Sequence, residues 1–112
     1  MGTTPFITVR ANRPLSEIEF CAWVAQAVSG DRLEYHRGFL AGDIVPSVSS
    51  LAANERTELS LLATRAAWVE AQGLVHLVQQ RLGPDLFAYL AIARPQKGAV
   101  RSVAVKQLAA AA

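Results

Sequence analysis

The stretch Glu70-Ala71-Gln72-Gly73-Leu74-Val75 joins two segments of different periodicity. Upstream of it, apolar residues recur at the three- and four-residue spacing of a helix face, and downstream a run rich in valine and leucine is typical of a strand. Gly73 lies at the junction and tolerates the left-handed conformation in which many helices end. The sequence therefore predicts a helix that leads directly into a strand.

The helix before this junction is predicted over residues 55–72. Asn54 is a suitable cap, and Glu55 and Glu58 lie in the first turn, where the positive end of the helix dipole favours acidic side chains. Its buried stripe is expected to consist of the apolar residues at helical spacing, which are Leu59, Leu62, Ala63, Ala66 and Val69.

After the junction the sequence predicts a β-hairpin. Leu74 to Leu82 is the first strand, Gly83-Pro84-Asp85 supplies the turn, and Leu86 to Arg94 is the returning strand. We expect residues 1–94 to form one domain and residues 95–112 to form a basic, flexible C-terminal tail.

The N-terminal half supplies a second long helix and two short strands. The segment Leu15-Ser16-Glu17-Ile18-Glu19-Phe20 contains a capping box, in which the serine caps the Glu19 amide and the glutamate reaches back to the serine. Gly30 is expected to end this helix. Phe6 to Arg10 and Leu33 to Phe39 alternate in polarity and are predicted strands.

The order helix, strand, loop, helix, hairpin resembles that of small winged-helix regulators. Glu70 to Val75 looks like the point where their recognition helix ends and the wing begins, and Gln79 to Asp85 then looks like the wing tip. The resemblance covers about residues 16–94 and implies an α+β fold with two main helices, a C-terminal β-hairpin and one or two additional short strands. One departure is residues 41–50, a predicted loop with one helical turn from Ser47, which leaves open whether residues 44–54 form the second helix of a helix-turn-helix.

The composition fits one soluble domain, because 52% of the 112 residues are hydrophobic and 18% are charged. The longest apolar run, Phe20 to Ala25, has six residues, whereas a helix that crosses a bilayer needs about 20. Met1 to Arg10 has no basic region followed by an apolar stretch, and a single cysteine cannot form an internal disulfide. We therefore expect a cytoplasmic protein with no membrane attachment.

The charge is unevenly distributed along the chain. Residues 1–16 carry a net charge of +2, residues 17–85 hold nine acidic residues against five arginines, and the last 27 residues carry +4. Basic ends can neutralise the phosphates of a nucleic acid. They can equally serve to keep a small protein soluble, so both interpretations remain open.

The resemblance assigns the helix 55–72 to the major groove of double-stranded DNA and residues 79–86 to the backbone or minor groove. Arg65 then reads guanine, Gln72 reads adenine and Thr64 reaches a phosphate. The full set of expected nucleic-acid contacts is Arg56, Thr64, Arg65, Gln72, Arg81, Lys97 and Arg101. The chain would act as a non-catalytic transcriptional regulator or accessory factor.

The same helix also supports an alternative function. Its three glutamates outnumber its two arginines, and a carboxylate that approaches a phosphate weakens binding. Leu61 and Trp68 lie on its outward side, and Trp23 lies on the more polar side of the first helix, so all three are candidate partner contacts. The alternative is a protein-interaction or oligomerisation module, such as a homodimer, that does not bind DNA. Burial of both tryptophans within the fold is the competing interpretation.

Residues suited to metal binding are few. His36, His76 and Cys21 show neither C-x-x-C nor H-x-x-x-H spacing, so no metal site and no cofactor are expected. Cys21 lies in an apolar run, which predicts a buried and unreactive thiol.

The segment Asp31 to Gly38 gathers five ionisable side chains. Arg32, Glu34 and His36 are expected to share one face of a strand, either as an acid–base group or as a solvated set of compensating charges. No phosphate-binding loop, dinucleotide fingerprint or nucleophile elbow occurs in the sequence, so we expect no enzymatic activity.

Overall fold

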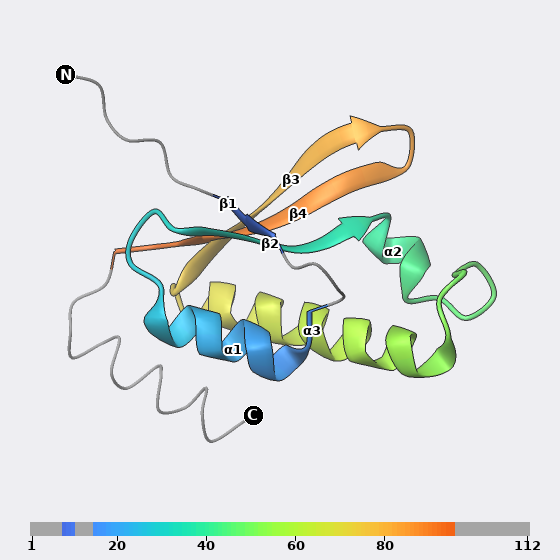
Figure 1. The fold of residues 1–112 in the computed structure, drawn as a ribbon, viewed down its shortest axis with the longest axis horizontal. Coiled ribbons are helices and arrows are strands. Elements are labelled where there is room, and N and C mark those ends of the chain that lie inside the picture. Colours follow the sequence, from blue (N-terminus) through green and yellow to red (C-terminus); the bar gives the residue numbers. More distant parts are fainter. Residues whose placement is uncertain (1–7, 11–14, 96–112) are drawn as a thin grey trace.

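The computed structural model describes residues 8–10 and 15–95 as an α+β fold (Figure 1). Its elements in chain order are β1 (Thr8–Arg10), α1 (Glu17–Gln26), β2 (Arg32–Gly38), α2 (Leu40–Asp43), α3 (Ala53–Ala71), β3 (Val75–Gly83) and β4 (Leu86–Ala93). The two long helices, the C-terminal hairpin and the additional short strands agree with the α+β architecture expected from the sequence.

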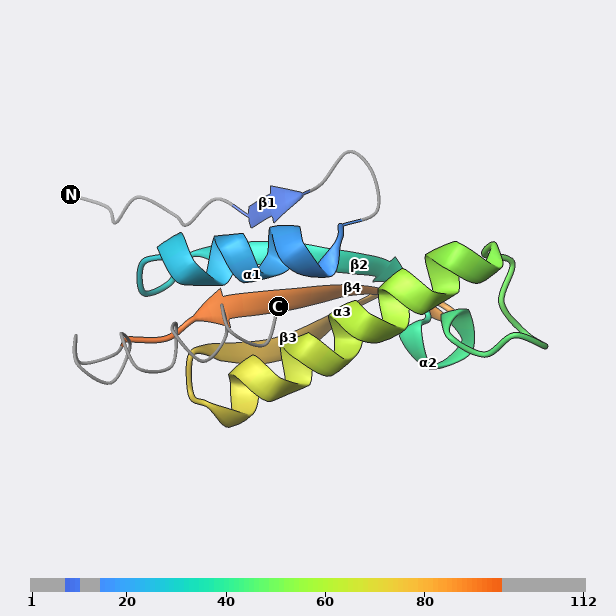
Figure 2. The ribbon, with the colours of Figure 1, turned by 90° about the horizontal axis from the view of Figure 1, so that it is seen from below.

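The strands form one sheet in the order β1-β2-β4-β3. β1 is parallel to β2, whereas the pairs β2–β4 and β3–β4 are antiparallel. Both long helices lie on the same face of this sheet, with α1 over β2 and α3 running obliquely across the strands (Figures 1 and 2). β3 is consequently the long outer strand of the sheet.

The start of α1 confirms the predicted capping box. Ser16 Oγ accepts a hydrogen bond from the Glu19 amide at 3.1 Å, and Glu19 Oε1 accepts one from the Ser16 amide at 3.0 Å. The predicted end at Gly30 is wrong, because the helix stops at Gln26. Gly30 instead donates its amide to Ala93 O at 2.8 Å, so the chain is already bound to the sheet at that residue.

The helix α3 begins one residue before the predicted cap. Ala52 is the cap residue, and its amide donates to Glu55 Oε1 at 3.0 Å, so Asn54 lies inside the first turn. The C-terminal end confirms the prediction, since Gly73 has φ +77° and the Leu74 amide donates to Val69 O at 3.0 Å.

The connection between β2 and α3 differs from the prediction. The helical turn is α2, which precedes the predicted position at Ser47, and residues 44–52 form turns without an α-helix. The turn near Ser47 is instead closed by two amides that donate to Val45 O, from Val48 at 3.1 Å and from Ser49 at 2.8 Å. The element before α3 is therefore a single turn of helix.

The hydrophobic core lies between the two long helices and the sheet. Phe20 and Val24 of α1, Leu62 and Val69 of α3, and Leu74 at the junction are almost fully buried. The stripe predicted for α3 is confirmed at Leu59, Leu62, Ala66 and Val69. Within the described residues, neither long helix combines the length and apolar character that crossing a bilayer requires.

Candidate functional site

A β-bulge in β2 separates the charged segment into two faces. The register with β4 slips by one residue between Glu34 and His36, so that Tyr35 and His36 both face the helices. Tyr35 is buried in the core, and the His36 ring lies 5.7 Å from the ring of Tyr89. The prediction that Arg32, Glu34 and His36 share a face is therefore wrong, because strict alternation ends at the bulge.

The opposite face of β2 holds the remaining charged pair. Arg37 Nε donates to Glu34 Oε1 at 2.5 Å, an ion pair between residues three apart in the chain. Residues three apart in a regular strand point to opposite faces, so this contact is a further consequence of the bulge. Glu34 and His36 are thus kept apart and do not form an acid–base pair.

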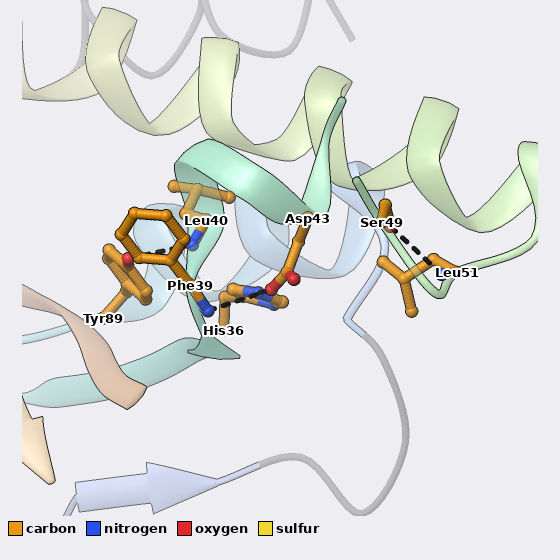
Figure 3. A network of polar contacts seen from close by, with 7 residues as sticks. All are labelled: His36, Phe39, Leu40, Asp43, Ser49, Leu51 and Tyr89. Atoms are coloured by element: carbon orange, nitrogen blue, oxygen red, sulfur yellow. Dashed lines mark hydrogen bonds and ion pairs between the residues drawn. The ribbon is translucent and has the colours of Figure 1, made fainter. Parts of the chain in front are cut away.

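His36 takes part in a polar clamp that fixes α2 to the end of β2 (Figure 3). Asp43 Oδ2 lies 2.7 Å from His36 Nε2 and accepts a hydrogen bond from the Phe39 amide at 3.1 Å. The Leu40 amide donates to the Tyr89 hydroxyl at 2.9 Å. The clamp therefore joins β2, α2 and β4 through side chains that meet only in the folded chain.

Gly38 makes the close approach inside the clamp possible. Its φ is +146°, which L side chains rarely adopt, and a Cβ at this residue would lie 2.5 Å from Asp43 Oδ2 and 3.2 Å from His36 Nε2. A side chain at Gly38 would consequently displace the carboxylate from the imidazole.

At the same end of the molecule as the clamp lie exposed apolar side chains that we term the apolar rim, which comprises Phe39, Val45, Val48, Leu82 and Leu86. Their exposed fractions range from 37% to 71%. Phe39 is the cap residue before α2, Val45 and Val48 follow α2, and Leu82 and Leu86 flank the turn between β3 and β4. α2 and this turn lie at the same end of the molecule (Figures 1 and 2). Phe39 is held there by the Phe87 ring, at 6.3 Å between centroids.

The two arginines of α3 are both engaged within the molecule. Arg65 Nε donates to Glu17 Oε2 at 3.1 Å, and its guanidinium carbon lies 5.5 Å from the centre of the Trp68 ring. An amino group of the Arg56 guanidinium donates to Leu51 O at 2.8 Å. Arg65 thus connects α3 to α1, and Arg56 fastens the loop before α3, while their contacts with nucleic acid stay predictions.

The other expected nucleic-acid residues lie apart from one another. Thr64 is exposed and its hydroxyl donates to Ser60 O at 2.9 Å, whereas Gln72 is exposed at the end of α3. Arg81 is exposed near the end of β3, where its Nε donates to Gly83 O at 3.3 Å. Two of the expected contacts, Lys97 and Arg101, lie outside the described residues.

The three candidate partner residues differ in exposure. Leu61 on α3 is 45% exposed. Trp23 and Trp68 are half-buried and pack against the core, with the Trp23 ring 6.5 Å from that of Phe20. Leu61 therefore points outward, as expected, whereas each tryptophan is partly buried against the core.

Sequence reasoning did not identify the apolar rim. Its members come from three separated segments, and the topology brings them to one end of the molecule. The available signal was Val45 and Val48 in a segment otherwise rich in glycine, proline and serine, where apolar side chains have no strand or helix face on which to be buried.

Two buried groups have pKa values above their ordinary range. Burial raises the pKa of the Cys21 thiol, a shift that the Arg65 charge opposes and the Glu17 charge reinforces. Burial also raises the pKa of Tyr35 to about 12, with smaller contributions from Tyr89 and Glu70. The Cys21 thiol is buried, as predicted, and its raised pKa disfavours the reactive thiolate.

The site thus combines the polar clamp with the exposed apolar rim at one end of the molecule. Within the described part of the chain, no three metal-ligating side chains gather at one point. Comparison with protein-family models, with curated proteins and with solved structures finds no match to this chain.

Proposed function

We propose that this chain is a non-catalytic interaction module that docks a protein partner through the apolar rim. The observation that carries the proposal is the rim itself, in which five large apolar side chains are exposed at one end of the molecule. Exposed apolar clusters on otherwise polar surfaces mark interaction sites more often than single exposed residues do. The rim joins separate elements, so a partner would recognise the folded chain and not a linear segment.

The clamp favours binding of a partner at the rim because it holds Phe39 in position. Asp43, His36 and Tyr89 fix the first turn of α2, which sets the position of Phe39. An anchor held in place before binding loses less conformational entropy when the complex forms. Aromatic side chains are frequent among the residues that dominate binding energies, and we assign Phe39 this role.

The exposed side of α3 also favours a protein partner over a polyanion. Glu55 and Glu58 are exposed near its start, and Leu61 is exposed farther along. Its cations Arg56 and Arg65 each hold an intramolecular partner. A helix presenting carboxylates toward phosphates would be repelled electrostatically.

Affinity capture with three forms of the full chain tests the proposal. In the rim variant, Phe39→Ser and Val48→Ser remove two exposed apolar groups. A control variant with Ile18→Ser in α1 and Val28→Ser just after α1 removes two others. The proposal expects proteins retained by wild type and control to be lost from the rim variant, with unchanged circular dichroism. Equal retention by all three forms contradicts it.

A second candidate function is a DNA-associated regulator or accessory factor, proposed from the order of the elements. The series α1, β2, α2, α3, β3, β4 follows the order on which the winged-helix resemblance rests. The charge of +4 on the last 27 residues adds support. A DNA retardation assay at about 50 and 200 mM salt tests it, because phosphate-driven binding weakens steeply with salt. Absence of binding at the lower salt contradicts this function.

A further inference from the structure

Within the described part of the chain, the outer edge of β3 pairs with no other strand. This strand spans the nine residues Val75–Gly83 and pairs with β4 on one side, whereas the other outer strand, β1, has three residues. Natural edge strands are commonly blunted by short length, by lysine or by proline. The segment VHLVQQRLG contains neither lysine nor proline.

One contact reveals the direction of the unpaired amides. The Leu77 amide donates to Glu70 Oε2 of α3 at 2.9 Å, so it points away from β4. Amides two residues apart in a strand point the same way, which places those of Gln79 and Arg81 on the free edge as well. Among the described residues, no group beyond the hairpin accepts a hydrogen bond from either amide.

The free part of the edge has defined limits. At its start the Leu77 amide already donates its hydrogen bond to the Glu70 carboxylate. At its end the register with β4 slips between Arg81 and Gly83. Both features prevent regular pairing beyond these points. The open edge is therefore a short segment centred on Gln79.

We propose that a second copy of this chain pairs with this edge, antiparallel and with Gln79 opposite Gln79 of the partner subunit. The two-fold axis then passes between the glutamines, and their backbones exchange two hydrogen bonds across it. The two four-stranded sheets become one continuous sheet, with the helices of both subunits on the same side because the axis is perpendicular to the sheet.

Charge complementarity favours a second copy as the occupant. In this register Leu77 lies opposite Arg81 of the partner subunit, and both side chains lie on the helix face. Glu70 already reaches the edge at Leu77. Each end of the interface therefore brings Glu70 of one subunit close to Arg81 of the other, and the two-fold axis repeats the pair.

This pairing is independent of the proposed docking at the apolar rim. It uses the backbone of β3 around Gln79 together with Glu70 and Arg81, whereas the one rim residue of β3, Leu82, lies beyond the open edge, at the register slip. Monomeric behaviour would overturn the pairing while leaving partner capture by the rim unchanged.

Sedimentation equilibrium of the full chain tests the pairing. We expect a mass about twice 12.0 kDa for wild type at high concentration. Gln79→Pro removes both amides at the axis without touching an amide bonded to β4, and should raise the dissociation constant at least about tenfold. Gln79→Ala keeps the amide and should dimerise as wild type. A monomeric wild type, or a Gln79→Pro variant as dimeric as wild type, overturns the proposal.

A charge exchange provides a test that does not depend on how Gln79→Pro folds. Glu70→Arg and Arg81→Glu each place like charges together across the interface and should each weaken the dimer. The double variant restores opposite charges in exchanged positions and should recover dimerisation relative to both single variants. A double variant weaker than either single variant contradicts the register.

Discussion

Gly38 illustrates how much one residue contributes to the site. Its positive φ and the 2.5 Å that would separate a Cβ from Asp43 Oδ2 leave no room for a side chain. We expect Gly38→Ala to destabilise the protein by about 1–3 kcal/mol, because both the backbone strain and the lost carboxylate contact act against folding. Urea unfolding followed by circular dichroism measures this loss.

Gly83 provides the matched control for Gly38. A Cβ at Gly83 meets no atom within 4 Å, and its φ lies outside the left-handed region. Gly83→Ala should therefore change the free energy of unfolding by less than about 1 kcal/mol. Equal effects of the two substitutions would show that Gly38 is not required for the close approach at the clamp.

Tyr35 should make the stability of the protein sensitive to alkaline pH. Burial raises its pKa to about 12 from the ordinary 10.0, so the folded protein favours the neutral phenol. The resulting stabilisation is complete below about pH 10 and is lost as the pH rises toward 12. Urea unfolding across this range should show a decline that is smaller in Tyr35→Phe.

The absorbance of tyrosinate offers a direct check on Tyr35. The chain has two tyrosines, Tyr35 and Tyr89, and Tyr35→Phe identifies the signal that belongs to the first. Ionisation of Tyr35 in the folded protein near its ordinary pKa would contradict the effect of burial.

At the scale of single elements, the capping box of α1 should carry a measurable part of the stability. Ser16→Ala removes the acceptor of the Glu19 amide and should cost about 1 kcal/mol. Ser29→Ala makes the same chemical change at an exposed position after the helix and should be close to neutral. Thermal unfolding of the two variants side by side measures the difference.

The start of α1 was more predictable from the sequence than the features that depend on contacts between distant residues. The capping box at Ser16 is a local arrangement of neighbouring residues, so its sequence specifies its geometry. The end of α1 depends on Gly30 bonding to Ala93, a residue far away in the chain. The early position of α2 likewise depends on Asp43 meeting His36. Periodicity carries no information about such distant partners.

At the scale of the whole molecule, one core holds the helices to the sheet. Leu61 and Leu62 are adjacent on α3, yet 45% of the first and 1% of the second is exposed. Leu62→Ala should cost about 2–5 kcal/mol because it leaves a cavity between α3 and the sheet. Leu61→Ala should cost less than about 1 kcal/mol. Chemical denaturation of both variants tests this contrast, and similar losses would contradict the single core.

The candidate site was less accessible to sequence reasoning than the core. Burial of Leu62 follows from spacing along one helix, which the sequence contains. Exposure of Phe39 depends on where β2 ends and on Phe87 from another strand. The engagement of Arg65 by Glu17 depends similarly on the contact between two helices. Functional surfaces that join several elements are therefore the last features to emerge from a sequence.

Because of the bulge, Tyr35 is the residue of β2 that has no partner in β4. Positions on either side of it keep the correct orientation, with Leu33 turned inward and Arg37 turned outward. Deletion of Tyr35 would leave these orientations unchanged, although it would remove a side chain from the core. Deletion of Leu33, in the regularly paired part of the strand, would instead turn Arg32 toward the core, where burial of its charge is costly.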